Sequence, residues 1–155
     1  MEVVLDNNTP AEVLQELALK EKSTMLLSLY NDDSYLKEMP PQYEKSKSIL
    51  RAVAKNPNTP PDTLKELFEF ECCPIEVLNN ISLNLILLEN PCFLEELYHN
   101  SADNYKVFGM DNVPSFFEEW GVYNKNISIR KSAALRIKTA SLLEICLKDE
   151  NPLVI

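Results

Sequence analysis

The sequence predicts an all-α chain built of stacked helical repeats, and three observations favour that fold class. Leucine pairs three residues apart recur along the 155 residues, each behind a turn that usually contains proline. Glycine occurs only at Gly109 and Gly121, whereas chains rich in strands use glycine in their turns. The ten prolines stand mostly where helices would begin, a position that does not need the missing N–H group.

Apolar residues at helical spacing, bounded by turn residues, locate the individual helices. Asn31-Asp32-Asp33 and Pro40-Pro41 predict a loop over 31–41. Gly109 and Gly121 predict turns over 108–113 and 121–126. We expect helices over residues 10–20, 22–30, 41–55, 60–70, 74–81, 83–88, 91–99, 101–107, 114–120, 127–136 and 139–148.

Several of these helices begin in the same way. Thr9 or Thr59 precedes a proline and is expected to cap free backbone N–H groups through its hydroxyl. An acid follows three residues after the threonine, either Glu12 or Asp62, and favours the positive end of the helix dipole. Glu12 would also complete a capping box with Thr9. Copies of this start, most of them with the same leucine spacing, begin at Thr9, Thr59, Cys73, Asn90 and Thr139.

The copies are unevenly spaced along the chain. Their anchor residues Leu14, Leu64, Leu78, Leu94 and Leu143 are separated by 50, 14, 16 and 49 residues. Each long interval has room for one further divergent unit, whereas the short intervals cannot hold a full helix pair. We therefore expect an irregular array. Its expected core is Leu14, Leu17, Leu50, Val53, Leu64, Leu67, Leu78, Ile81, Leu94, Leu97, Ala134, Leu143 and Cys146.

The turn between two of the expected helices resembles a known repeat family. Residues 51–64 are similar to the leucine-rich repeat variant family, and the residues that carry the likeness are Arg51-Ala52-Val53-Ala54-Lys55-Asn56-Pro57-Asn58-Thr59-Pro60-Pro61-Asp62-Thr63-Leu64. Ile129-Arg130-Lys131-Ser132-Ala133-Ala134 resembles another start of such a unit. The resemblance implies a short right-handed α-solenoid, akin to HEAT and armadillo repeats, that acts as an interaction surface. Some members bind an iron–sulfur centre through an N-terminal cysteine cluster, but residues 1–8 contain no cysteine, so no cofactor is expected.

The chain is expected to form a single helical-repeat domain over residues 1–155, with an irregular insertion at about 100–125 that packs on the repeats. This segment is rich in aromatic residues, for which two roles stay open. They could fill a core, or they could form an exposed patch around Trp120, since tryptophan and tyrosine dominate interface energetics. The aromatic residues are Tyr105, Phe108, Phe116, Phe117, Trp120 and Tyr123.

The sequence offers no catalytic constellation, so we expect a protein that is not an enzyme. His99 is the one histidine, and no Walker loop, dinucleotide-binding turn or Gly-x-Ser-x-Gly elbow is present. The cysteines Cys72, Cys73, Cys92 and Cys146 lack Cys-x-x-Cys spacing and are expected to be free thiols. A metal or cluster site formed by the first three of them is the alternative.

The charge pattern leads to two hypotheses about partners. The net charge of −9 opposes nonspecific binding to nucleic acid. Residues 45–55 and 125–138 are nevertheless basic and contain no acid, and equivalent helices of a solenoid line one face. The leading hypothesis is a non-catalytic scaffold that binds another protein, and the alternative is a nucleic-acid-binding protein that uses this basic ridge. A solvated, non-binding helix face is the simplest interpretation of the charges. The candidate partner-binding residues are Arg51, Lys55, Trp120, Arg130 and Lys131.

No apolar run is long enough to span a membrane, and the N-terminus has no secretory signal pattern. A cytoplasmic protein is therefore expected. The apolar end Leu153-Val154-Ile155 would either cover the last helix or promote dimerisation, so the oligomeric state stays open.

Overall fold

The computed structural model describes residues 4–30, 40–70, 73–100 and 104–154. All regular structure in these residues is helical, and they contain no β-strand, which confirms the predicted all-α class. The chain divides into two compact units, Met1–Ala102 and Asp103–Ile155. The division falls inside the aromatic segment 100–125, and the single domain expected over residues 1–155 stays a prediction.

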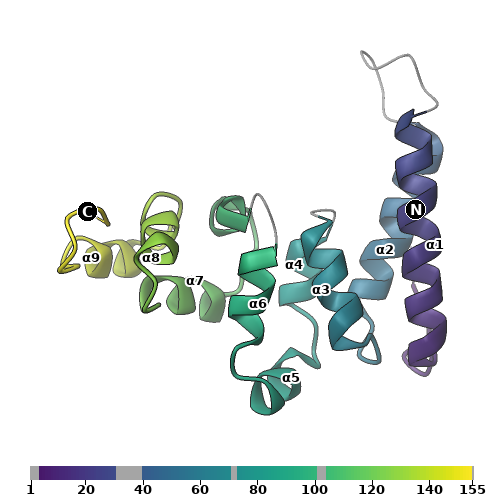
Figure 1. Cartoon of the computed structure of the whole chain (residues 1–155), viewed down its shortest axis with the longest axis horizontal. Helices are drawn as coiled ribbons and strands as arrows, with labels where there is room; N and C mark the ends of the chain where they lie inside the picture. The colour runs from purple at the N-terminus through teal and green to yellow at the C-terminus, as the bar shows by residue number, and fades with distance from the viewer. Residues whose placement is uncertain (1–3, 31–39, 71–72, 101–103, 155) are drawn as a thin grey trace. The chain divides into compact units, whose positions relative to one another are not determined.

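The described helices follow the expected order (Figure 1). Unit 1 contains α1 (Ala11–Tyr30), α2 (Pro41–Lys55), α3 (Pro61–Glu69), α4 (Pro74–Leu78), α5 (Leu83–Glu89) and α6 (Phe93–Asn100). Unit 2 contains the 3₁₀ helix η1 (Asn104–Gly109) and the α-helices α7 (Ser115–Val122), α8 (Ile127–Ala134) and α9 (Ala140–Cys146). Most of the expected loop over 31–41 and the start of the expected helix over 101–107 lie outside the described residues.

The two helices expected over 10–20 and 22–30 form one continuous helix, α1. No proline or glycine interrupts this stretch, so nothing in the sequence ends the helix at its middle. The intervening residue Glu21 is buried, and its carboxylate accepts a hydrogen bond of 2.7 Å from the hydroxyl of Ser46 in α2. The buried stripe of α1 has helical spacing and consists of Leu14, Ala18, Glu21 and Met25.

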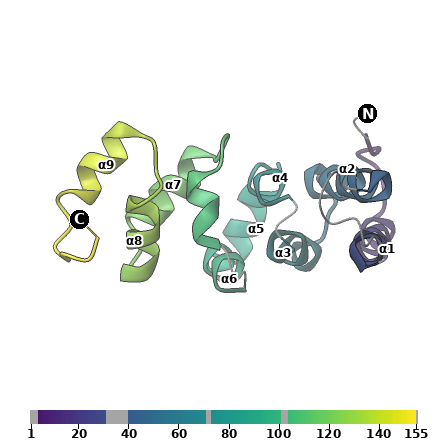
Figure 2. The ribbon, with the colours of Figure 1, turned by 90° about the horizontal axis from the view of Figure 1, so that it is seen from above.

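Within unit 1 the helices α1, α3 and α6 lie side by side in one layer (Figure 2). Ion pairs join each helix of this layer to the next. Lys22 of α1 pairs with Glu66 of α3 at 3.1 Å, and Lys65 of α3 pairs with Glu96 of α6. Both pairs thus link helices that are neighbours in the layer.

The helices α2 and α4 form a second layer of unit 1. Arg51 of α2 pairs with Glu76 of α4, with 3.3 Å between Nε and the carboxylate. The helix α5 follows α4 in the chain, mainly contacts α6, and lies at the lower edge of unit 1 in Figure 1. It belongs to neither layer.

Most of the expected core is confirmed. Leu14, Leu50, Val53, Leu64, Leu67, Leu78, Leu94, Leu97 and Cys146 are buried. Ile81 was expected in the core but is 76% exposed. This expectation was wrong because α4 ends at Leu78, so the helical spacing no longer applies three residues later.

Three other expected core positions also need correction. Ala134 and Leu143 are only half-buried, and their chain neighbours Ala133 and Leu142 face the core instead. In α8 the buried position is therefore one residue earlier than expected, and in α9 the same holds for Leu143 but not for Cys146. Leu17 is also half-buried.

The core of unit 2 contains an aromatic cluster. Phe108 of η1 and Phe117 of α7 are buried, and their rings stack with centroids 5.0 Å apart. Phe117 stacks in turn on the half-buried Trp120 at 5.1 Å. The core-filling role is thus confirmed for Phe108 and Phe117. Phe116 is half-buried and Tyr123 is exposed, while the side chain of Tyr105 lies outside the described part.

None of the helices in the described part of the chain is both long and apolar enough to cross a membrane.

Candidate functional site

Asparagine and aspartate turns connect the helices throughout both units. In each of them a side-chain oxygen accepts a hydrogen bond from the backbone N–H two residues later, which is the geometry of an Asx turn. Asn80, for example, accepts a bond of 2.8 Å from the N–H of Ser82. The residues that form such turns are Asp6, Asn56, Asn80, Asn90, Asn124, Asn126, Asp149 and Asn151.

In unit 1 three of these turns are linked to one another through buried amides. The Asn56 side chain donates a bond of 2.9 Å to the carbonyl of Asp6. The Asn80 side chain donates bonds of 2.9 Å to the carbonyl of Asn56 and 2.7 Å to that of Ala54. Asn56 and Asn80 are 3% and 4% exposed, and the two bonds from Asn80 satisfy backbone carbonyls that are shielded from water. We call this set of residues the asparagine ladder.

Thr59 does not cap the helix that follows it. The Thr59 hydroxyl donates to the carbonyl of Val53, six residues earlier, and no side chain caps α3. Cys73 repeats this geometry, since its Sγ lies 3.8 Å from the carbonyl oxygen of Leu67. Thr9 donates to the carbonyl of Asp6 at 2.6 Å. The expected capping role was therefore wrong at Thr59, where the hydroxyl closes the preceding helix.

Arg130 joins two turns of unit 2. Its guanidinium donates to the Asp149 carboxylate at 2.6 and 3.1 Å and to the carbonyl of Asn124 at 2.9 Å. The Asp149 hydrogen bond raises the pKa of Arg130. In return the Arg130 hydrogen bond, and after it the backbone N–H of Asn151, lower the pKa of Asp149. This expected partner-binding residue therefore holds the fold of unit 2 together.

The other candidate cations differ in their environments. Arg51 pairs with Glu76, and Arg51, Lys55 and Lys131 are all exposed. Arg51 and Lys55 belong to unit 1, whereas Arg130 and Lys131 belong to unit 2. A single basic ridge made of all four residues stays a prediction. Trp120 lies at the edge of the aromatic cluster of unit 2, against Phe117.

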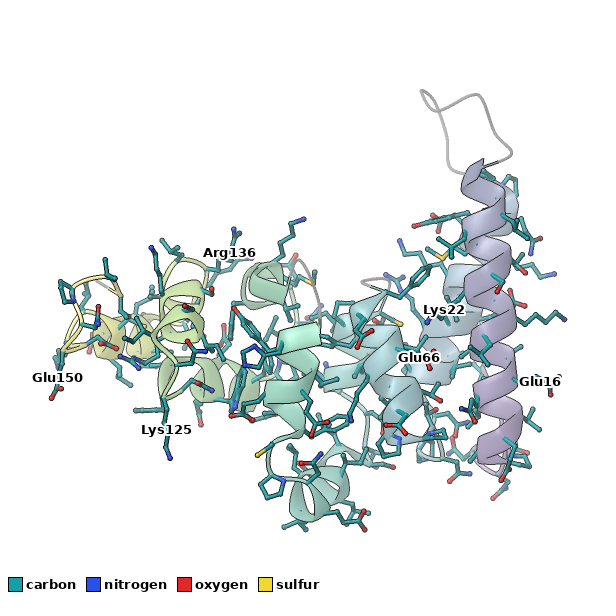
Figure 3. The ribbon with its side chains drawn as sticks, viewed as in Figure 1. Glu16, Lys22, Glu66, Lys125, Arg136 and Glu150 are labelled. Atoms are coloured by element: carbon teal, nitrogen blue, oxygen red, sulfur yellow. The ribbon has the colours of Figure 1, made fainter. Side chains whose placement is uncertain are left out.

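Two lysines of the first layer repeat one arrangement (Figure 3). Lys22 lies next to Glu66, as the labelled side chains show, and its Nζ is 5.6 Å from the centroid of the Phe70 ring. Lys65 lies next to Glu96 and 5.4 Å from the centroid of the Phe93 ring. The hydrogen bond to Glu96 raises the pKa of Lys65. The pKa of Glu96 is lowered first by the Asn90 side-chain amide and then by Lys65.

The thiols and the histidine form no described metal centre. Cys73 and Cys146 are buried, Cys92 is exposed, and these three are free thiols. Burial raises the pKa of Cys146, which makes it a weak nucleophile. No group of three or more potential metal ligands occurs among the described residues, which exclude Cys72. His99 is exposed near the end of α6, with its ring edge-on to Tyr98.

Sequence reasoning missed the asparagine ladder and the Arg130–Asp149 bridge. The spacing of the turn residues could have indicated both features. Asn80 follows Asn56 after 24 residues, and Asp149 follows Asn124 after 25.

Comparisons with models of protein families, with curated protein sequences and with solved structures found no match to this chain. The resemblance to the leucine-rich repeat variant family therefore stays a prediction from residues 51–64.

Proposed function

We propose that this chain is a non-catalytic protein-interaction scaffold, a short right-handed α-solenoid of the leucine-rich repeat variant type. The observation that carries the proposal is the asparagine ladder of Asp6, Asn56 and Asn80. Buried amides that join one interhelical turn to the next are what stacked repeats require, because each repeat leaves its turn carbonyls to be satisfied by its neighbour.

The two-layer arrangement of unit 1 gives this proposal further support. Ion pairs link α1 to α3, α3 to α6 and α2 to α4, so each layer grows by adding a helix beside the previous one. Extended surfaces of this kind serve mainly to bind other macromolecules. The thiols of Cys73 and Cys146 are buried, which fits a structural role better than a catalytic one.

A protein partner fits the charges better than a nucleic acid does. Binding to a phosphate backbone requires cations that can release counterions. Arg51 and Arg130, two of the candidate contacts, are already paired with Glu76 and Asp149. The chain also carries a net charge of −9.

Affinity capture with the full chain tests the proposal. Tagged protein is incubated with native lysate, with and without nuclease treatment, and the retained proteins are identified by mass spectrometry and quantified. We expect a specific protein to be retained at a stoichiometric level whether or not nuclease is present. Retention that disappears with nuclease, or a salt-dependent mobility shift with a short RNA or DNA duplex, would favour the nucleic-acid hypothesis instead. A lysate that yields no specific partner would count against the scaffold.

A further inference from the structure

The helix α5 exposes an apolar face that neither layer of unit 1 covers. Its inward side is anchored by Leu83 and Ile86, which are buried. Its outward side presents Leu85 and Leu88, which are 64% and 79% exposed, and Ile81 in the turn before the helix is 76% exposed. Leu85 and Leu88 follow the spacing i, i+3 that places side chains on one face of a helix. We call these two residues, together with Ile81 in the preceding turn, the α5 stripe.

The α5 stripe differs from ordinary surface leucines. Single exposed apolar residues are common on proteins and carry no meaning by themselves. A contiguous group of large apolar side chains is costly to leave in water and marks an interaction site. Leu85 and Leu88 also belong to a helix that is additional to the two layers, so the layers do not require these outward residues.

The charges around α5 indicate what can cover the stripe. Between Lys65 and Lys106 the sequence contains eight aspartates or glutamates and no lysine or arginine. Glu89, one turn after Leu85 on the same face, is exposed. The segment Met1–Ala102 holds 17 acidic and 8 basic residues, which accounts for the whole net charge of −9, whereas Asp103–Ile155 is balanced.

This charge distribution selects one occupant. A second copy of the chain would bring an equally acidic surface against the stripe, and like charges at close range oppose such a contact. A positively charged segment with apolar residues at helical spacing would gain both burial of the stripe and attraction to the acidic surroundings.

We propose that the α5 stripe is a docking surface for a basic amphipathic helical segment of a partner protein. The inference rests on the scaffold function and specifies its site and the chemistry of its partner.

A peptide-binding experiment on the full chain tests this inference. The probe is a short, fluorescently labelled amphipathic peptide of leucine and lysine, with its leucines on one helical face. The double variant Leu85→Gln with Leu88→Gln is compared with the matched variant Leu26→Gln with Leu27→Gln. The latter changes two exposed leucines of α1, near Lys20 and Lys22, and all four changed residues are exposed, so both variants should retain the helical circular dichroism of the parent chain.

We expect fluorescence anisotropy to show saturable binding of the leucine–lysine peptide to the parent chain and to the α1 variant. Binding to the α5 variant should be at least about tenfold weaker, because two leucines that would be buried are replaced by amides. Binding should weaken with added salt, and a leucine–glutamate peptide of the same pattern should not bind.

Equal affinity of all three proteins for the leucine–lysine peptide would overturn the assignment of the site. Equal binding of the leucine–glutamate peptide would overturn the charge preference. Sedimentation that shows a dimer of the parent chain, abolished by the α5 variant, would show that a second copy covers the stripe and would also overturn the proposal. These outcomes are independent of affinity capture, since a nuclease-resistant partner that binds the α5 variant normally would keep the scaffold function and reject only this site.

Discussion

Asn80 donates a hydrogen bond of 2.9 Å from its side-chain amide to the carbonyl of Asn56, 24 residues earlier in the chain. The same amide reaches the carbonyl of Ala54 at 2.7 Å, and the Asn80 side-chain oxygen accepts from the N–H of Ser82. One buried side chain therefore satisfies three backbone groups in two different turns. This is why the position of α5 and α6 relative to α2 depends on a residue that belongs to no helix.

Replacing Asn80 with alanine should destabilise unit 1. The change removes three hydrogen bonds and leaves two shielded carbonyls without this donor, so the free energy of unfolding should fall by about 2–4 kcal/mol. Urea unfolding followed by circular dichroism gives this value. The control is Asn84→Ala, because Asn84 is exposed on α5. If both substitutions have the same small effect, the ladder contributes little to stability.

Leu78 and Ile81 should respond differently to truncation although they share one leucine-type spacing. Leu78→Ala removes a buried side chain and should cost about 2–5 kcal/mol. Ile81→Ala changes a side chain that is 76% exposed and should stay within about 0.5 kcal/mol of the parent. Equilibrium unfolding of the two variants measures both. A large loss with Ile81→Ala would restore the originally expected register.

Gly121 should tolerate no side chain. A Cβ atom at this position would lie 2.4 Å from the Phe108 ring and 3.1 Å from Cβ of Ala133, so Gly121→Ala should destabilise unit 2 by about 1–3 kcal/mol. Gly109→Ala is the matched control, because the nearest atom to its Cβ is in Arg136 at 3.6 Å. The loss of stability is measured by thermal unfolding. Comparable melting of both variants would show that Phe108 does not pack where the structure places it.

Acid should weaken unit 2 through Asp149. Arg130 lowers the pKa of this carboxyl in the folded protein. The ion pair therefore stabilises the fold fully above the pKa that Asp149 has in the unfolded chain. This stabilisation is lost as the pH falls through the lower pKa that Asp149 has in the folded protein. Asp149→Asn retains an oxygen that can accept from Asn151 but removes the charge. We expect the difference in unfolding free energy between parent and variant to stay constant above about pH 5 and to shrink as the pH falls further. A pH-independent difference, or one matched by the exposed control Glu144→Gln, would contradict this assignment.

Local signals in the sequence were sufficient for the type and location of most helices. The range 41–55 was expected and is α2 without any change, because Pro41 can start a helix and Asn56-Pro57 ends one. The helix over 22–30 was not separate, since no residue near Glu21 interrupts α1. A residue that interrupts a helix can be recognised in the sequence. A continuous helix is indicated only by the absence of such residues.

The assignment of helices to layers could not be made from local patterns. The copies that begin at Thr9, Thr59 and Asn90 start α1, α3 and α6, which form one layer. The copy at Cys73 starts α4, which packs beside α2 in the other layer. Both kinds of helix need a proline-containing start and an apolar stripe, so the pattern does not distinguish them. The anchor Leu78 belongs to the second layer, whereas Leu64 and Leu94 belong to the first. The short intervals of 14 and 16 residues therefore separate helices of different layers.

The sequence indicated which charged residues of the candidate site are notable, but it did not indicate which residues they pair with. Arg51 and Arg130 were identified as notable cations, but their ion pairs reach residues 25 and 19 positions away, Glu76 and Asp149. Contacts at such separations depend on how the helices stack. Thr59 was expected to cap α3, whereas its hydroxyl donates instead to the carbonyl of Val53 near the end of α2, which also accepts from the N–H of Asn56.

The stacking of turns is tested most directly by nuclear Overhauser effects from the side-chain amide protons of Asn80 in isotope-labelled protein. Stacked turns predict cross-peaks from these protons to the α protons of Ala54 and Asn56, together with slow solvent exchange of the amide. If the Asn80 amide exchanges rapidly and shows cross-peaks only to its own neighbours in the chain, the turns do not stack and the scaffold loses its structural basis.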